Sequence, residues 1–481
     1  MISLRPYQQE AVDALYSYLG KGNGLLVLPT GSGKSVVQAE FLRRALADFP
    51  SERFLLVSHV RELLVQNAEK ITALWPEAPV GLYSAGLKRR DIAPITVAGI
   101  QSVYQRADEF GDVGVVIIDE CHLVPKSGQG MYRTLLGDLQ QVNPSLKIVG
   151  MSATHYRLNS GYLHQGDGAM FSGVAYEVGV NQLIKDDYLC NLKSKMGVTR
   201  IDTSRIHLRA GEFVDHELNE AMDTDDLVHR AVGEIAQWCE FRKKILVFCC
   251  GVQHAQHVAA ELKANGIDTG CVWGEMEDDE RDRVLSDFRS GTLRAVTNCN
   301  VLTVGFDAPN IDAIVLLRPT MSPGLYVQMV GRGFRKADGK EDCLILDFGG
   351  NILRHGPVDQ VVVRGKGERS APAPFKECPN CHAVIGIALL TCPECGYEYP
   401  KPAGMPPVPR HDVRPADLDI LSGTDRKSIF HAEIDHVTYR KWDSKKGKPP
   451  TLRVDHWEGF THYSQWVSLE ASGGARWHAE Q

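Results

Sequence analysis

Short apolar runs alternate with longer helical stretches, and this alternation occurs twice along the chain. The runs are Gly24–Leu28, Phe54–Val57, Val115–Ile118 and Lys147–Gly150, followed by Ile245–Phe248, Arg294–Thr297, Ile314–Leu317 and Cys343–Leu346. Strands that alternate with helices pair in parallel, because each helix returns the chain to the same end of the sheet. The sequence therefore predicts an α/β protein with two lobes, each built on a parallel sheet.

Composition changes divide the rest of the chain. A polar, Gly-rich stretch from His155 to about Asp187 is typical of a connection between lobes or an inserted loop. Beyond the second series, Gly and Pro predict flexible linkers on either side of a cysteine cluster. We expect a first lobe at 1–185, a second lobe at 186–356, a linker at 357–377, a cysteine-rich module at 378–400 and an accessory domain at 410–481.

The bulk composition fits a soluble globular protein and excludes a wholly disordered one, with 43% apolar and 23% charged residues. The net charge of −7 argues against a surface that is basic throughout, but a local basic stripe is enough to bind nucleic acid. The amino terminus resembles no export signal, and no apolar run approaches the ~20 residues of a membrane helix. We therefore expect a cytoplasmic protein without a membrane partner.

Eight cysteines are scattered, mostly among apolar residues. In a cytoplasmic chain they are expected to be reduced, buried thiols rather than a disulfide framework. They are Cys121, Cys190, Cys239, Cys249, Cys250, Cys271, Cys299 and Cys343.

The sequence Pro29–Ser35 (PTGSGKS) lies between the first apolar run and a helical stretch. Backbone N–H groups of such a loop surround a phosphate, and the following helix adds its dipole. Lys34 is expected to reach the β and γ phosphates of ATP, and the hydroxyl of Ser35 to bind Mg²⁺. Leu28 replaces the glycine that usually begins the pattern, so an ordinary strand-to-helix turn is the alternative. The residues of the loop are Thr30, Gly31, Ser32, Gly33, Lys34 and Ser35.

An acidic pair, Asp119 and Glu120, follows the apolar run Val115–Ile118. Ligands of open α/β sheets bind at the carboxyl ends of the strands, where this pair is expected to lie. Asp119 is expected to hold Mg²⁺ and Glu120 to orient the attacking water. The alternative is a plain turn or cap, which the phosphate loop upstream disfavours.

Together these motifs resemble those of superfamily II helicases, over about the first 350 residues. More narrowly, the chain resembles the RadD-type DNA-repair ATPases and related phage helicases. The matching segments are Leu4–Val12 (adenine recognition), Pro29–Ser35 (motif I), Ser58–Asn67 (Ia), Gly99–Val103 (Ib), Asp119–His122 (II), Ser152–Thr154 (III), Ile245–Phe248 (IV), Asn298–Pro309 (V) and Gln328–Arg335 (VI).

The resemblance implies two RecA-like lobes that hydrolyse ATP at their shared cleft and move on single-stranded or branched DNA in repair, recombination or replication. Recombination or single-strand-binding proteins are further candidate partners. An RNA helicase and an ATP-gated DNA-binding adapter without strand separation remain as alternatives, whereas the motif VI pattern disfavours a P-loop kinase.

The resemblance also implies roles for single residues. Gln8 would contact the adenine edge, with Arg5 and Tyr7 framing the base, and Asp307 would contact the ribose or the interface between the lobes. Three residues would reach across the cleft, with the last as the arginine finger: Gln328, Arg332 and Arg335. Four residues would hold the sugar-phosphate backbone, although each is about equally well explained as plain surface: Arg61, Gln101, Ser102 and Thr303.

Two Cys-Pro-x-Cys pairs predict a zinc ribbon at 378–400, because four thiolates at this spacing suit tetrahedral Zn²⁺. An iron–sulfur cluster or redox dithiols are the alternatives. The string CxxCH at Cys378–His382 also matches a haem-attachment motif, which the second pair and the lack of an export signal disfavour. The predicted zinc ligands are Cys378, Cys381, Cys392 and Cys395.

Between Tyr439 and Trp457, aromatic residues alternate with lysines and arginines. Aromatic rings stack on bases and cations bind phosphates, so the segment suits an accessory nucleic-acid contact. A small β-rich domain with a solvated basic hairpin explains the pattern equally well.

Overall fold

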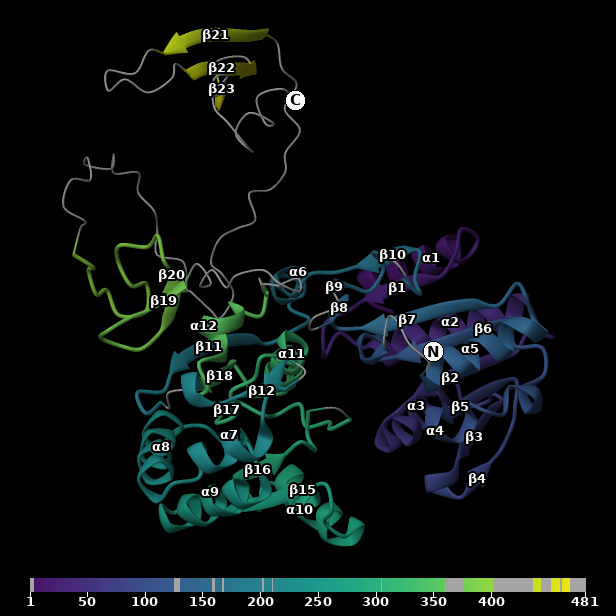
Figure 1. Ribbon diagram of the computed structural model, residues 1–481, viewed down its shortest axis with the longest axis horizontal. Helices are drawn as coiled ribbons and strands as arrows, with labels where there is room; N and C mark the ends of the chain where they lie inside the picture. The colour runs from purple at the N-terminus through teal and green to yellow at the C-terminus, as the bar shows by residue number, and fades with distance from the viewer. Residues whose placement is uncertain are drawn as a thin grey trace. The chain divides into compact units, whose positions relative to one another are not determined.

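The computed structural model describes residues 4–124, 130–157, 161–166, 168–200, 203–209, 211–303, 305–359, 361, 375–400, 436–442, 451–458 and 461–467. The chain forms two units, Met1–Gly423 and Thr424–Gln481, and each is described by itself. The first unit contains two α/β lobes and a small cysteine-rich module (Figure 1).

The first lobe is built on an eight-stranded sheet. Neighbouring strands are parallel except at one edge, where β4 runs antiparallel to β3. In spatial order the strands are β10 (Gly173–Glu177), β1 (Gly24–Val27), β7 (Lys147–Ser152), β6 (Val115–Asp119), β2 (Phe54–Ser58), β5 (Ile95–Gly99), β3 (Val80–Ser84) and β4 (Arg89–Arg90).

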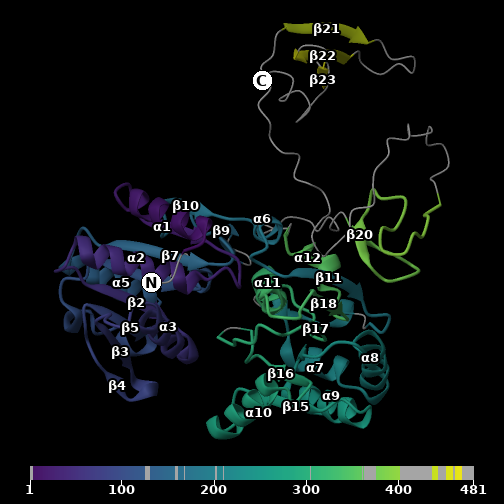
Figure 2. The ribbon, with the colours of Figure 1, turned by 180° about the vertical axis from the view of Figure 1, so that it is seen from behind.

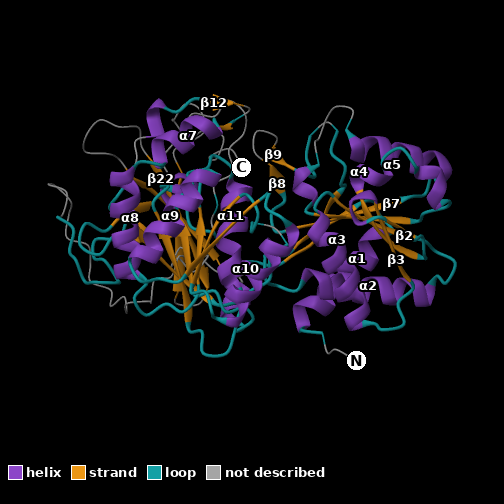
Figure 3. Cartoon of the chain, turned by 90° about the horizontal axis from the view of Figure 1, so that it is seen from below, coloured by secondary structure: helices purple, strands orange, loops and turns teal. Residues whose placement is uncertain are grey.

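Helices cover both faces of this sheet, as Figures 2 and 3 show. Alternate strand residues supply the two apolar layers: Leu56 packs among the helices of one face and Leu55 among those of the other. Both faces of the central strands are buried, and this explains why β1 and β2 are apolar over almost their whole length. The first face carries α1 (Pro6–Leu19), α2 (Lys34–Asp48) and α3 (Arg61–Leu74), and the second carries α4 (Ile100–Val103), η2 (Ala107–Phe110) and α5 (Met131–Val142).

The second lobe has a six-stranded, wholly parallel sheet. Its spatial order is β11 (Asn191–Met196), β18 (Asp342–Asp347), β17 (Ala313–Leu316), β14 (Ile245–Phe248), β16 (Ala295–Cys299) and β15 (Thr269–Trp273). One face is covered by α7 (Asp215–Met222), α8 (Asp225–Trp238) and α9 (Val252–Ala264), and the other by α10 (Asp278–Ser290), α11 (Pro323–Gly331) and α12 (Asn351–His355).

All eight predicted runs form strands of the two sheets, so the predicted fold class is confirmed. The stretch predicted as a connection or inserted loop contains more structure than expected. Its strand β10 pairs with β1 in the first sheet, and α6 (Val180–Lys185) follows before β11 enters the second sheet. Further strands of the two sheets that the apolar runs did not predict are β3, β4, β5, β11 and β15.

Smaller elements connect the lobes' main strands. They are the 3-10 turns η1 (Ala85–Leu87), η3 (Cys121–Leu123), η4 (Thr203–Arg205) and η5 (Arg332–Phe334), and the strand pairs β8 (Tyr156–Arg157) with β9 (Gly161–Tyr162) and β12 (Leu208–Arg209) with β13 (Glu212–Phe213). The ring of His155 stacks on Tyr162 with centroids 5.1 Å apart, which fixes the chain after motif III.

The cysteine-rich module contains β19 (Phe375–Glu377) and β20 (Val384–Gly386), which pair in antiparallel orientation. It is attached to the edge of the second sheet, because the N–H of Met196 in β11 donates to the carbonyl of His382 at 2.9 Å. Of the scattered cysteines, Cys271 is only partly buried and the other seven are buried, and none forms a disulfide.

The second unit contains an antiparallel three-stranded sheet of β21 (His436–Trp442), β22 (Thr451–Glu458) and β23 (Thr461–Val467). Arg440 lies opposite Arg453, which lies opposite Trp466. The lysines predicted to contact nucleic acid, Lys445, Lys446 and Lys448, lie outside the described residues. In the described part of the chain, no helix has the length and apolarity needed to cross a membrane.

Candidate active site

The phosphate loop Pro29–Ser35 connects the carboxyl end of β1 to α2. Gly31 and Gly33 have φ angles of 86° and 81°, in the left-handed region that strains other residues. Because α2 begins at Lys34, this lysine and Ser35 occupy the first helical turn. The segment is therefore a sharp strand-to-helix loop of the kind that surrounds a phosphate with backbone N–H groups.

The ammonium group of Lys34 lies 3.6 Å from a carboxylate oxygen of Glu120, and both side chains are largely buried. Among the described residues this ammonium has no hydrogen-bond partner. A buried cation without hydrogen-bond partners is costly, and phosphate oxygens would supply them. The residues of the loop therefore fit a nucleotide phosphate.

The two carboxylates that end β6 carry opposite pKa shifts. Burial and the neighbouring Glu120 raise the pKa of Asp119. Burial alone would also raise the pKa of Glu120, but the positive charges of Lys34, His122 and Arg332 outweigh it and hold that pKa below its usual range. Glu120 is therefore ionised at neutral pH.

Asn67 fixes the first of these carboxylates, a role that the sequence analysis did not assign. Its side-chain amide donates to one Asp119 oxygen at 3.2 Å, and the N–H of Glu120 donates to the other at 3.0 Å. Only the sheet order, which places β2 beside β6, brings α3 and Asn67 to this point. A carboxylate oriented in this way, with a hydroxyl such as that of Ser35, matches the oxygen ligands that Mg²⁺ prefers.

His122 joins three of the motifs. Its Nδ1 lies 2.8 Å from the hydroxyl of Ser152 and 3.3 Å from a Glu120 oxygen, and its Nε2 lies 3.1 Å from the side-chain nitrogen of Gln328. Gln328 belongs to α11 of the second lobe, whereas the other three residues belong to the first. The predicted reach of Gln328 across the cleft therefore ends on His122, which the sequence analysis had not singled out.

The two predicted motif VI arginines are held by carbonyl groups of motif V. Arg332 donates to the carbonyl of Phe306 at 2.7 Å, and Arg335 donates to the same carbonyl at 2.9 Å. Arg335 also pairs with Asp307 at 2.9 Å, and Lys70 of the first lobe lies 4.0 Å from that carboxylate. Asp307 therefore lies at the interface between the lobes, which is one of the two positions predicted for it; the other was beside the ribose.

Motif VI packs directly on the phosphate loop. A β-carbon added to Gly331 would lie 2.7 Å from Cβ of Thr30, so only glycine allows this approach. A β-carbon added to Gly31 would lie 3.4 Å from Cγ of Arg335. The arginines of one lobe therefore lie beside the phosphate loop of the other.

The predicted adenine-recognition segment contacts the phosphate loop. Tyr7 donates to the carbonyl of Ser32 at 2.5 Å, and the side-chain amide of Gln8 donates to the same carbonyl at 3.1 Å. Tyr188, from the chain between the lobes, was not predicted: its ring centroid lies 5.3 Å from that of Tyr7 and 4.8 Å from the guanidinium carbon of Arg5.

Two of the predicted backbone-holding residues lie after β5. Gln101 donates to the carbonyl of His59 at 3.1 Å, and the hydroxyl of Ser102 accepts from the N–H of Ala85 at 2.9 Å. The segments that follow β2, β5 and β3 are thereby joined at one edge of the sheet.

The other two predicted backbone-holding residues lie where the lobes meet, Arg61 in the first lobe and Thr303 in the second. Arg61 forms an ion pair with Asp278 at 3.2 Å, and both side chains are more than half exposed. Gln66 donates to the carbonyl of Gly305. The carbonyl of Thr303 accepts a hydrogen bond from Arg332 of motif VI. These contacts join motif Ia to motif V and α10.

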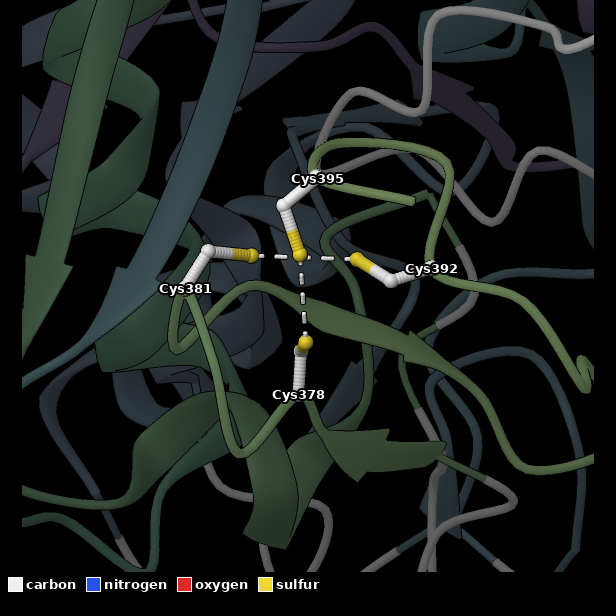
Figure 4. Close-up of side chains that lie close together, drawn as sticks. All are labelled: Cys378, Cys381, Cys392 and Cys395. Carbon is white, nitrogen blue, oxygen red and sulfur yellow. Dashed lines mark hydrogen bonds between the residues drawn. The ribbon is translucent and has the colours of Figure 1, made fainter. Parts of the chain in front are cut away.

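The four clustered cysteines point toward a common centre (Figure 4). Their sulfur atoms all lie within 4.8 Å of one another, with Cys378 to Cys395 at 3.6 Å and Cys381 to Cys392 at 3.7 Å. A tetrahedral Zn²⁺ with bonds of about 2.3 Å requires sulfur separations of roughly 3.8 Å, whereas a disulfide bond is about 2.05 Å long. The donor set and its spacing therefore fit zinc.

Comparison with known proteins identifies two domains. Residues 1–157 match the family model described as "Type III restriction enzyme, res subunit", and residues 228–337 match that of the helicase conserved C-terminal domain. The first contains motifs I and II, and the second contains motifs V and VI.

Individual relatives agree with these domains. The "Putative ATP-dependent helicase IRC3" of Saccharomyces cerevisiae is 30% identical over 72% of this chain, and the chain spans about half (51%) of that relative's length. The DNA 3'-5' translocase XPB2 of Sulfurisphaera tokodaii is 25% identical over 76% of this chain and 85% of the relative. The helicase Lhr of Mycobacterium smegmatis, in a solved structure, has the same fold, with a TM-score of 0.52, 20% identity and coverage of 74% of this chain and 49% of that one.

The matched models, the relatives and the two parallel-sheet lobes agree with the order of the motifs along the chain. Together they support the assignment of the chain to the superfamily II helicases.

Proposed function

We propose that the chain is an ATP-dependent DNA helicase or translocase, which hydrolyses ATP between its two lobes in order to move along DNA. One observation carries the proposal: the ion pair of Lys34 with Glu120 is linked through His122 to Gln328 of the other lobe. Hydrolysis and the relative position of the lobes are coupled wherever one lobe holds the phosphates and the other completes the site.

The residues would divide the chemistry as follows. Lys34 neutralises charge on the β and γ phosphates, and Glu120, ionised and close to His122, orients the attacking water and accepts its proton. Arg335 moves from Asp307 onto the γ-phosphate as the cleft closes and stabilises the charge of the transition state. Asp119 and Ser35 would hold Mg²⁺, which supplies a second positive charge at the phosphates.

DNA is the proposed track because a relative that aligns over 85% of its own length is named a DNA translocase. The backbone of one strand would lie across the carboxyl edges of the sheets, where Arg61, Gln101, Ser102 and Thr303 lie. The narrower resemblance to RadD-type ATPases supports a role in DNA repair. We also propose lobe limits of 1–185 and 186–356, which the membership of β10 and β11 in different sheets supports.

The proposal is tested by ATP turnover with single-stranded DNA, forked DNA and RNA, followed by strand displacement on forked DNA. We expect single-stranded or forked DNA to stimulate turnover. Stimulation by RNA alone would instead assign an RNA helicase, and stimulation by DNA without displacement or translocation would assign an ATP-gated adapter.

Two variants test the assigned chemistry in the same assay. Lys34→Ala is expected to abolish turnover and weaken ATP binding, because the phosphates lose their cation. Glu120→Gln is expected to bind ATP but not hydrolyse it. Wild-type turnover by Glu120→Gln would show that another group orients the water.

We further propose that Cys378, Cys381, Cys392 and Cys395 bind one structural Zn²⁺. Two features support a closed metal site. The sulfur separations are close to those of a tetrahedral site. The residues that follow the two pairs, His382 and Gly396, have positive φ angles of 60° and 73°, so each pair turns back in the same way.

A further inference from the structure

We propose that the segment Ala85–Arg90, named here the basic hairpin, is a further phosphate-binding site for the DNA strand. The inference rests on the proposed function, and it extends the strand's path beyond motifs Ia and Ib. The segment comprises η1, Lys88 and β4 and lies next to Arg61 and Ser102 in the first lobe.

The sheet order places the basic hairpin beside the predicted contacts. The strands β2, β5 and β3 are adjacent and parallel, so their carboxyl ends lie in a row along one edge of the sheet. Motif Ia follows β2, motif Ib follows β5, and the basic hairpin follows β3. Adjacent strands are about 4.8 Å apart, so each step along the row is shorter than one side chain of arginine in full extension.

Contacts between these segments fix the hairpin's place. The N–H of Ala85 donates to the hydroxyl of Ser102 at 2.9 Å. A β-carbon added to Gly86 would lie 4.0 Å from Cδ of Arg61. The basic hairpin is therefore hydrogen-bonded to Ser102 and lies beside Arg61, two residues that are themselves proposed to hold the backbone.

The charge of the segment suits phosphate. Lys88, Arg89 and Arg90 are consecutive and all exposed. Arg89 pairs with Asp91 at 2.6 Å, but both side chains are more than half exposed, and such pairs contribute little and exchange readily for a phosphate. The hairpin turns at Lys88, whose φ is 52°, so this lysine lies at the turn between β3 and β4.

Protection of the sheet edge is the alternative explanation for these charges. β4 is the last strand of the sheet, and charged edge strands prevent pairing with other chains. Arg90 also lies opposite Tyr83, whose hydroxyl donates to Glu109. Edge protection works with either sign of charge, whereas phosphate binding needs positive charge. Reversal of the charge therefore separates the two explanations.

The test measures the affinity of the full-length protein for a fluorescent oligo-dT at several salt concentrations. The charge-reversal variant is Lys88→Glu, Arg89→Glu, Arg90→Glu, and the charge-retaining variant is Lys88→Arg, Arg89→Lys, Arg90→Lys. A matched control removes three cations from the amino edges of the sheets: Lys21→Ala, Lys147→Ala and Lys243→Ala.

We expect the charge-reversal variant to keep the wild-type melting temperature and to lose at least about tenfold in affinity at low salt. The slope of log affinity against log salt concentration should be smaller in magnitude by roughly 2, because each of the three lost phosphate contacts on a single strand contributes about 0.7. The charge-retaining and control variants should bind like the wild type. Unchanged affinity and slope on charge reversal would overturn the inference, as would an equal loss in the control.

The same experiment separates a failure of the proposed function from a failure of the basic-hairpin inference. If the wild-type protein itself binds no oligo-dT and DNA does not stimulate its ATP turnover, both the DNA motor and the basic hairpin's role are wrong. If the wild type binds DNA and hydrolyses ATP normally while charge reversal has no effect, only the inference fails.

Discussion

At the scale of single residues, the ionisable side chains of the cleft shift one another's pKa values. Lys34, with smaller contributions from His122 and Arg332, lowers the pKa of Glu120, whereas burial and the charge of Glu120 raise the pKa of its neighbour Asp119. Addition of Mg²⁺ and phosphate would change this balance, since the metal favours the anionic form of Asp119 and the phosphates attract Lys34.

Arg335→Ala is predicted to leave ATP affinity nearly intact and to slow hydrolysis by about 10³-fold or more, as arginine fingers do in related phosphoryl transfers. The guanidinium now pairs with Asp307 beside the phosphate loop, so its effect is expected in the transition state. Single-turnover kinetics with DNA would measure it. Arg335→Lys should remain slow, because lysine keeps the charge but lacks the planar fork. Normal hydrolysis by the alanine variant would remove motif VI from the mechanism.

Tyr188→Ala is predicted to raise the KM for ATP several-fold with little change in kcat. The ring lies against Tyr7 and under Arg5, where it would form one wall of the adenine pocket. Loss of an aromatic contact costs about 0.5–1.5 kcal/mol, which corresponds to that change in KM. Tyr188→Phe keeps the ring and is the control. The prediction fails if the alanine variant has the KM of the wild type.

At the scale of elements, most of the strands that the sequence predicted are buried on both faces. The runs at β1, β2, β6 and β14 are continuously apolar because helices cover both sides of each strand. The missed strand β11 (NLKSKM) lies at a sheet edge and contains only two apolar residues, and β10 (GVAYE) is an edge strand that is only half-buried. Edge strands have weaker apolar patterns, so a local scan favours loops there.

Local sequence patterns likewise predicted only part of the candidate active site. The strand-to-helix loop and the acidic pair after β6 are local patterns, and the structure brings Lys34 and Glu120 together at the edge that they predicted. Asn67 and Tyr188 reach that edge, and His122 reaches Ser152 and Gln328, only through the order of the strands and the packing of the lobes. No local spacing indicates these three contacts.

The cysteine module yields a prediction at this scale. The purified protein is expected to contain about one zinc per chain, because four thiolates form a closed structural site. Cys392→Ser should lose the metal and loosen the module, whose core includes this buried side chain, while ATP binding at Lys34 persists. Cys271→Ser, a partly buried thiol outside the cluster, is the control. Elemental analysis would decide: iron, or no metal in freshly reduced protein, contradicts the prediction.

At the scale of the whole molecule, the chain between the lobes contacts the adenine-recognition segment, the phosphate loop and motif VI. Leu189 lies over Gly31, since a β-carbon added there would be 3.3 Å from its Cδ2, and the N–H of Cys190 donates to the carbonyl of Phe334 at 2.7 Å. Residues that join both lobes to the phosphate loop are placed to transmit a change at one site to the other. A change in the distance between the lobes would therefore also change the contacts of this connection.

The last prediction concerns the second unit, whose three-stranded sheet pairs Arg440 with Arg453 on adjacent strands. The segment between these strands contains Lys445, Lys446 and Lys448, which lie outside the described residues. If they bind phosphates, their joint change to Ala should weaken DNA binding and lower its salt slope, because fewer counterions are released. ATP turnover at saturating DNA should persist, since the catalytic residues all precede Gly349. An unchanged affinity and slope would show that the lysines are a solvated surface, and the second unit would then be a structural or protein-docking domain.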